Sequence, residues 1–218
     1  MQPAHDGVLQ IEPTDQCNLR CNMCAPHNEG WAQIHAVPKG TMDFGLYETI
    51  IDGLVEDDCR FDHIIFQWLG DPSLHPALPK MLAVAAHKMK GRVGYLRVDT
   101  NAIRLPPRRM DEILAAVSEQ VPLLLVFTVD AHTPTTYQKV KGVDALERVR
   151  SNIRYLVRQR ALQKVPVNIQ IQFVVQNGNE HEAGEFLAYW TDLLNCQGGE
   201  DWHDEVMFKR LSVGGGTT

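Results

Sequence analysis

Hydrophobic and polar residues follow one another in blocks that predict strands and helices in alternation. Short apolar runs that end at Gly, Pro, Asp or Asn predict six strands, at residues 8–11, 61–69, 93–98, 123–129, 165–175 and 206–211. Apolar residues at helical spacing predict helices between them, at residues 44–54, 78–88, 110–118, 144–163 and 180–194. This order predicts an α/β fold of parallel β/α units with right-handed crossovers.

Composition and charge exclude several classes of protein. The chain has 218 residues, 44% of them hydrophobic and 22% charged, which is typical of a folded domain and not of a disordered chain. A net charge of −6 argues against a protein that coats nucleic acid, and there is no nucleic-acid signature. The longest apolar run, residues 121–129, is far below the ~20 residues of a membrane span. The first ten residues do not resemble a signal peptide, so we expect a cytoplasmic protein without a membrane partner.

The length fits one large domain or a tight pair of domains. We expect a single domain to occupy residues 1–213, because no repeat or low-complexity stretch divides them. Residues 214–218, Gly-Gly-Gly-Thr-Thr, directly follow the last predicted strand and form a tail, either a linker or a frayed end.

Three of the five cysteines are clustered in a way that predicts a metal or cluster site. Cys17, Cys21 and Cys24 have the spacing C-x3-C-x2-C in a polar, loop-like segment, whereas cysteines that fill a core need apolar neighbours. Spacing alone leaves two kinds of site open. His27 extends the pattern to a Cys3His zinc site. Three cysteines without a fourth favour instead an iron–sulfur cubane with one iron left open for a ligand.

Polar residues follow the predicted strands at one end. The cysteine loop follows the first strand, and Gly-Asp-Pro, Asp-Thr-Asn, Thr-Val-Asp and Gln-Asn-Gly-Asn follow the next four. The carboxyl ends of parallel strands lie at one edge, where α/β proteins bind ligands, so we expect a ligand site there. Each Asp, Asn or Thr taken singly is also a common helix cap.

These motifs, in this order, resemble the radical S-adenosylmethionine (radical SAM) superfamily. The C-x3-C-x2-C motif is the specific feature. Weaker segments add to it along essentially the whole chain: Leu69-Gly70-Asp71-Pro72, Thr100-Asn101-Ala102, Thr128-Val129-Asp130-Ala131, Val140-Lys141-Gly142, and Phe173-Val174-Val175-Gln176-Asn177 with Asn179-Glu180-His181-Glu182. The last of these resembles members that carry a C-terminal auxiliary-cluster domain of the SPASM or twitch type, which this sequence does not show.

The resemblance implies a fold, two cofactors and a reaction. It implies a partial (β/α)6 TIM-like barrel with the site at the carboxyl ends of its strands. It implies a 4Fe-4S cluster on Cys17, Cys21 and Cys24, with S-adenosylmethionine (SAM) on the open iron. One electron, from a donor such as reduced flavodoxin or ferredoxin, would cleave SAM to a 5′-deoxyadenosyl radical that takes hydrogen from a substrate. The substrate is unknown; a peptide or protein is slightly favoured over a sugar or small metabolite.

The resemblance also assigns site residues. No catalytic residue is assigned. Residues expected to bind SAM are Gly70, Asp71, Pro72, Thr100, Asn101, Thr128, Asp130, Val174 and Asn177. Arg97 and Asp99 are candidates for the substrate side, whereas we expect Lys139 and Lys141 to lie on a solvated helix face.

Five positions depart from the family pattern, among them Trp68 and Leu69, which replace small residues upstream of the Gly-Glu-Pro motif. Met23 stands where an aromatic is usual, and Asp71 replaces the Glu of Gly-Glu-Pro. Ala102 replaces the Gly of Thr-Asn-Gly, which puts a positive φ at that position in question. The altered motif leaves open an alternative function, a non-catalytic zinc- or cluster-binding scaffold whose SAM site has decayed.

Overall fold

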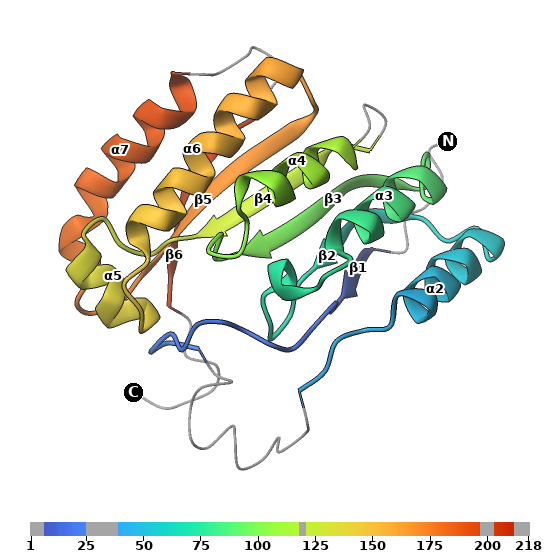
Figure 1. Ribbon diagram of the computed structural model, residues 1–218, viewed down its shortest axis with the longest axis horizontal. Coiled ribbons are helices and arrows are strands. Elements are labelled where there is room, and N and C mark those ends of the chain that lie inside the picture. Colours follow the sequence, from blue (N-terminus) through green and yellow to red (C-terminus); the bar gives the residue numbers. More distant parts are fainter. Residues whose placement is uncertain (1–6, 25–38, 118–120, 197–202, 212–218) are drawn as a thin grey trace.

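Six parallel strands form one sheet whose order follows the sequence (Figure 1). The computed structural model describes residues 7–24, 39–117, 121–196 and 203–211. The strands are β1 (Val8–Ile11), β2 (Phe61–Phe66), β3 (Val93–Thr100), β4 (Leu123–Thr128), β5 (Val167–Val175) and β6 (Glu205–Arg210). Each pairs in parallel with the next, and β1 and β6 are the two edges of the described sheet. The predicted α/β fold is confirmed as a partial (β/α)6 barrel.

Helices cover one face of this sheet (Figure 1). They are α2 (Phe44–Glu56), α3 (Leu78–Lys88), α4 (Pro107–Ala115), α5 (Pro134–Lys141), α6 (Leu146–Gln163) and α7 (Ala183–Asn195), with short 3-10 turns η2 (Pro72–Leu74) and η3 (Glu180–Glu182). The core lies between the helices and the sheet, because alternate strand residues such as Ile64, Val98, Phe127 and Ile171 are buried there. No described helix is long and apolar enough to cross a membrane.

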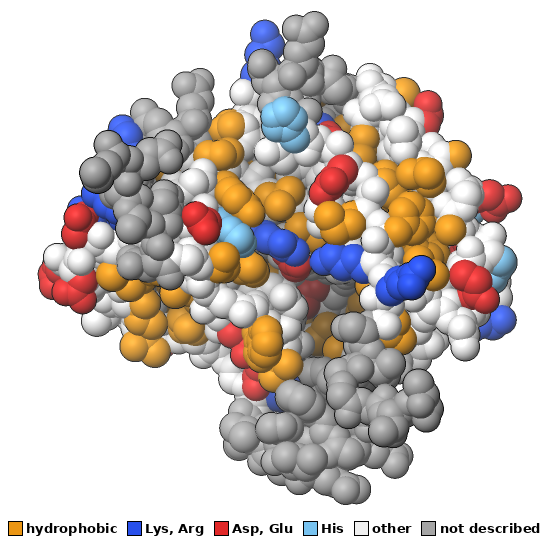
Figure 2. Space-filling model, turned by 180° about the vertical axis from the view of Figure 1, so that it is seen from behind, with side chains coloured by type: hydrophobic (Ala, Val, Ile, Leu, Met, Phe, Trp, Pro, Cys, Tyr) orange, Lys and Arg blue, Asp and Glu red, His pale blue; other side chains and the backbone are white. Residues whose placement is uncertain are grey.

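The other face of the sheet carries many polar side chains. The strand register places the following residues on it: His63, Ile65, Tyr95, Arg97, Asp99, Leu124, Val126, Thr128, Asn168, Gln170 and Gln172. Figure 2 shows the molecule from the side away from the helices, where charged side chains lie among apolar ones. Because core strands normally bury apolar residues on both faces, this polar lining indicates a ligand-binding surface.

Most predicted elements agree with the structure, and the differences lie at their ends. Strand β2 stops at Phe66, three residues before the predicted end, and β3 continues two residues further to Thr100. Helix α4 begins at Pro107 rather than at residue 110, since proline is well tolerated in the first turn of a helix. Residue 118, the predicted end of that helix, and the predicted tail at 214–218 lie outside the described residues.

The sequence predicts a helix at Lys139 and Lys141 but not the bounds of helix α5. It is short and contains two threonines, which have low helix propensity. Its boundaries are nevertheless well defined: the Thr133 hydroxyl accepts a hydrogen bond from the Thr136 N–H, Pro134 begins the first turn, and Gly142 ends the helix with φ 82°. The helix follows β4 at the edge of the sheet where the polar motifs gather.

Candidate functional site

A cavity of about 310 Å³ lies at the carboxyl ends of the strands. Its walls come from segments that are far apart in the sequence: Cys17, Leu19, Cys21, Cys24, Gln67, Trp68, Leu69, Gly70, Asp71, Asp99, Thr100, Asn101, Thr128, Lys141 and Gln172. All three clustered cysteines therefore face the same space as five of the nine residues expected to bind SAM.

The cysteine loop is held in place by backbone contacts from two neighbouring segments. The Asn22 N–H donates to the Val140 carbonyl over 3.0 Å, which ties the loop to the end of α5, and Leu19 is buried in the core. On the other side, the Asp71 N–H donates to the Gln16 carbonyl over 2.8 Å. A Cβ at Gly70 would overlap the Thr14 carbonyl oxygen, so only glycine allows this close approach.

The thiol pKa values show that the three cysteines share one environment. Burial raises the pKa of Cys17, Cys21 and Cys24. Like charges on neighbouring thiolates raise these pKa values as well, whereas the Lys141 ammonium opposes the rise at all three. A bound cation would remove this penalty, since metals bind the deprotonated thiolate.

The Asp71 carboxylate links its own turn after β2 to the end of β3 through hydrogen bonds. It accepts hydrogen bonds from the Ser73 N–H at 2.9 Å, the Thr100 hydroxyl at 2.8 Å and the Asn101 N–H at 2.8 Å. A carboxylate that accepts several bonds is well satisfied when buried. The aspartate in place of glutamate therefore has a structural role of its own and is no sign of a decayed site.

The Thr-Asn-Ala segment turns sharply below the cysteine loop. The Asn101 side-chain amide donates to the Asn18 side chain over 2.9 Å, linking the end of β3 to the cysteine loop. Ala102 has φ 64°, so the position keeps a left-handed backbone although it carries a side chain. The doubt raised by the missing glycine is thus answered by the structure.

Lys141 does not lie on a solvated helix face as expected. Its side chain is buried, lines the cavity, and places Nζ 2.5 Å from Asp130 Oδ2. Burial alone would lower the pKa of Lys141, but Asp130 and Cys21 raise it on balance, so the ammonium stays charged. Lys139 is exposed, as predicted.

Asp130 lies behind Lys141 and does not line the cavity. It is fully buried, and its second oxygen accepts the Val174 N–H over 2.6 Å. Val174 and Asn177, the other two residues expected from this region, do not line the cavity either, and Asn177 is exposed. Pro72 is buried in the turn behind Asp71.

Gln172 is a cavity residue that sequence reasoning missed. It lies beside Thr128 across β4 and β5, is only 7% exposed, and its Oε1 has no hydrogen-bond partner among the described residues. The alternation of β5 could have placed it on this face, but Gln172 lies just before the family-like segment that begins at Phe173. A buried acceptor without a partner needs a donor, such as a hydroxyl or ammonium group of a ligand.

Comparison with models of protein families identifies the superfamily of this chain. The model of the radical SAM superfamily matches residues 11–169, more than half of the chain, from β1 into β5. This chain belongs to the radical SAM superfamily.

Relatives of this radical SAM protein support the fold. The tungsten-containing aldehyde ferredoxin oxidoreductase cofactor-modifying protein of Pyrococcus furiosus is 29% identical over 191 residues, which cover 85% of this chain and 48% of that protein. SuiB of Streptococcus suis bound to S-adenosylmethionine superposes with a TM-score of 0.63 at 13% identity, over 97% of this chain and 42% of SuiB. Methylornithine synthase, PylB, gives 0.58 at 10% identity, over 94% and 54%. This chain thus spans about half the length of these relatives.

Radical SAM enzymes use a 4Fe-4S cluster and SAM, and the residues of the cavity fit this pair. Among the residues that the structure describes, no three His, Cys, Asp or Glu side chains are arranged to bind one metal ion. His27, the fourth ligand of the Cys3His alternative, lies outside that part of the chain. In a cubane each thiolate binds a different iron, so the sulfurs lie farther apart than around one ion. The unpartnered Gln172 oxygen and buried Lys141 are suited to the donors and carboxylate of SAM.

Proposed function

We propose that this radical SAM enzyme reductively cleaves SAM and uses the resulting 5′-deoxyadenosyl radical to abstract hydrogen from a substrate. The observation that carries the proposal is the shared cavity wall of Cys17, Cys21, Cys24 and Lys141. The three thiolates would each bind one iron of a 4Fe-4S cluster. When bound, the cluster supplies the electron and one open iron for SAM.

The protein's own side chains would bind and orient SAM. Among the described residues the Lys141 ammonium donates to Asp130, and its two further N–H groups would donate to the SAM carboxylate. The Gln172 carbonyl oxygen would accept from a ribose hydroxyl, with Thr128 beside it on β4. At Gly70 and Asp71 the backbone carbonyls would accept hydrogen bonds from the methionyl amine. Replacing the glutamate side chain of the family motif with aspartate would therefore not change this contact.

The substrate would approach along the polar face of the sheet. Arg97 and Asp99 form a bidentate pair on β3, at 2.6 and 2.7 Å, and Asp99 reaches the cavity wall. A charged and amide-rich surface suits a polar group better than an aliphatic one. We favour a peptide or protein substrate. The similarity to the cofactor-modifying protein of Pyrococcus furiosus favours a second candidate substrate, a cofactor destined for an oxidoreductase.

A one-electron reductant is required by the superfamily's chemistry. We propose reduced flavodoxin or ferredoxin as that partner. We expect either protein to support SAM cleavage in place of a chemical reductant.

Anaerobic reconstitution tests the proposal. The protein is loaded with iron and sulfide and reduced with dithionite, and its EPR spectrum is recorded with and without SAM. We expect a reduced-cluster signal that changes on adding SAM, and formation of 5′-deoxyadenosine. Cys21→Ala should abolish both, whereas Cys196→Ala, an exposed cysteine outside the cavity, should leave them intact. Tight stoichiometric zinc in place of iron, with no 5′-deoxyadenosine, would contradict the proposal.

A further inference from the structure

The residue that supports Lys141 is itself held in an unfavourable backbone conformation. Asp130 has φ 63°, a left-handed conformation in which residues other than glycine are uncommon, although Asp and Asn adopt it more readily than the rest. Its carboxylate holds the Lys141 ammonium, and it sits at the end of β4 where the chain turns into α5. Such strain persists only where surrounding contacts impose it, so the contacts that hold Asp130 also decide where Lys141 points.

Two buried residues after β5 supply those contacts. The Asn179 side-chain amide, fully buried, donates to the Asp130 carbonyl over 3.0 Å and to the Val174 carbonyl over 2.9 Å. The Glu182 carboxylate, 3% exposed, accepts from the His132 N–H at 2.5 Å and the Thr133 N–H at 3.1 Å. Asp130 is thus held at its own carbonyl and two residues further along the chain.

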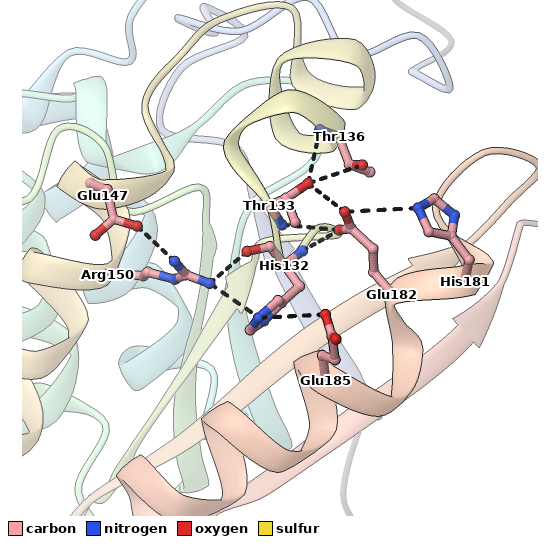
Figure 3. Close-up of polar contacts among 8 residues, drawn as sticks. All are labelled: His132, Thr133, Thr136, Glu147, Arg150, His181, Glu182 and Glu185. Carbon is pink, nitrogen blue, oxygen red and sulfur yellow. Dashed lines mark hydrogen bonds and ion pairs between the residues drawn. The ribbon is translucent and has the colours of Figure 1, made fainter.

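Figure 3 shows how Glu182 from η3 points into the turn that begins α5. The Thr133 hydroxyl donates to Glu182 Oε1 over 2.5 Å while also accepting from the Thr136 N–H. Thr133 alone already caps the helix, so a buried glutamate is more than α5 needs as a cap. Burying the charged Glu182 carboxylate is unfavourable, so we expect a role of Glu182 beyond helix capping.

We propose that Glu182 and Asn179 are positioning residues for SAM binding, which act by holding the Asp130 turn and through it the Lys141 ammonium. This inference rests on the proposed role of Lys141 toward SAM. Neither residue lines the cavity, so we expect neither to contact SAM directly. Their effect is transmitted through two links, from the η3 turn to Asp130 and from Asp130 to Lys141.

The test is a double-mutant cycle on the reconstituted protein, with SAM affinity measured by anaerobic calorimetry. Glu182→Gln should raise the Kd for SAM about three- to thirty-fold, as expected for a residue that acts through a network. It should leave the EPR signal of the reduced cluster without SAM unchanged. In a Lys141→Met background the same substitution should have no further effect on the Kd, because the group it positions is gone.

Glu185→Gln is the matched control. Glu185 lies three residues further on, its side chain is 75% exposed, and among the described residues its one ion pair is with the His132 ring at 3.9 Å, so its loss should not alter the Kd (Figure 3). Asn179→Asp tests the second contact independently, since it replaces the donor facing the Asp130 carbonyl with an acceptor and keeps the oxygen that accepts the Gln176 N–H. It should raise the Kd in the same range.

The outcomes separate the inference from the proposal beneath it. An unchanged Kd in both Glu182→Gln and Asn179→Asp, with a lower unfolding midpoint, would overturn the inference and leave a structural cap. An equal rise of the Kd in the Lys141→Met background would overturn it too, because Glu182 would then act by another route. If Lys141→Met itself left the Kd unchanged, the proposed role of Lys141 would fall together with the inference.

Discussion

The Lys141 ammonium and the Asp130 carboxylate form a buried ion pair at 2.5 Å, with Lys141 on the cavity wall and Asp130 behind it. Burying two charges is costly, and a well-packed apolar replacement is often at least as stable. A purely structural pair would therefore be a weak choice for this position. Beside the three thiols the pair has a function in ligand binding, because it keeps a charged ammonium at the place where an anionic ligand would lie.

Stability and SAM binding should respond differently when the pair is removed. Lys141→Met leaves Asp130 buried without its partner and should lower the free energy of unfolding by about 3–5 kcal/mol. Asp130→Asn combined with Lys141→Met removes both charges and keeps an acceptor for the Val174 N–H, so most of that loss should be recovered. Urea unfolding measures the recovery, while SAM affinity should stay low in both variants. Recovery of SAM affinity in the double variant would contradict a direct role for the ammonium.

Gly70 should tolerate no side chain, because a Cβ there would overlap the Thr14 backbone. Gly70→Ala must push the cysteine loop away from the Gly-Asp-Pro turn, and we expect a loss of at least about 2 kcal/mol in stability. It should also lower the iron content after reconstitution. The control is Gly53→Ala within α2, where a Cβ would meet no atom within 4 Å. That substitution should raise stability by up to about 1 kcal/mol, through helix propensity.

The strands and the cysteine site could be predicted from the sequence, whereas the support behind the site could not. An apolar run such as 123–128 must be buried in a sheet, so the run itself predicts a strand. The C-x3-C-x2-C motif is also visible directly, because its residues are close together in the sequence. The burial of Lys141 depends on a partner eleven residues away and on a turn held by β5 and η3. No periodicity encodes such a contact. For the same reason Asp130 could be placed at the edge of the sheet but not behind the cavity wall.

Ala102 shows a related limit of sequence reasoning. Glycine is the usual residue at φ 64°, so its absence argued against that conformation. The Asn152 side-chain amide donates to the Ala102 carbonyl over 2.8 Å, and the Thr100 hydroxyl accepts from the Ala102 N–H over 3.2 Å. The Thr100 bond is local, whereas the Asn152 bond comes from α6 and exists only in the folded chain, so the residue type at position 102 does not by itself decide the conformation.

Acid should weaken the contact between Glu182 and the α5 turn. Burial alone would raise the pKa of Glu182, but hydrogen bonds from Thr133, Thr136 and the backbone of His132 and Thr133 lower it on balance. A carboxyl with a lowered pKa stabilises the fold fully above its unfolded value of about 4.3, and this contribution is lost as pH falls through the folded pKa. Wild type should therefore lose its stability advantage over Glu182→Gln between about pH 5 and the acid limit of folding.

Urea unfolding at a series of pH values from neutral to acidic measures that difference. Glu185→Gln serves as the comparison, because Glu185 is exposed and should give a nearly constant difference from wild type. A difference between wild type and Glu182→Gln that stayed constant down to the acid limit would show that the Glu182 contact does not depend on its charge.

Trp68 should report SAM binding directly. Its side chain is 57% exposed although it lines the cavity with the cysteines, and an exposed indole loses water contact when a ligand packs against it. Adding SAM to the reconstituted protein should therefore change the intrinsic fluorescence, and Trp68→Phe should remove most of that change. Trp190 is fully buried in the core beside Phe186, so Trp190 gives no matching signal. Trp31 and Trp202, which lie outside the described residues, are replaced by Phe in every variant compared, so a SAM-dependent change that survived in Trp68→Phe would mean that the ligand does not occupy this side of the cavity.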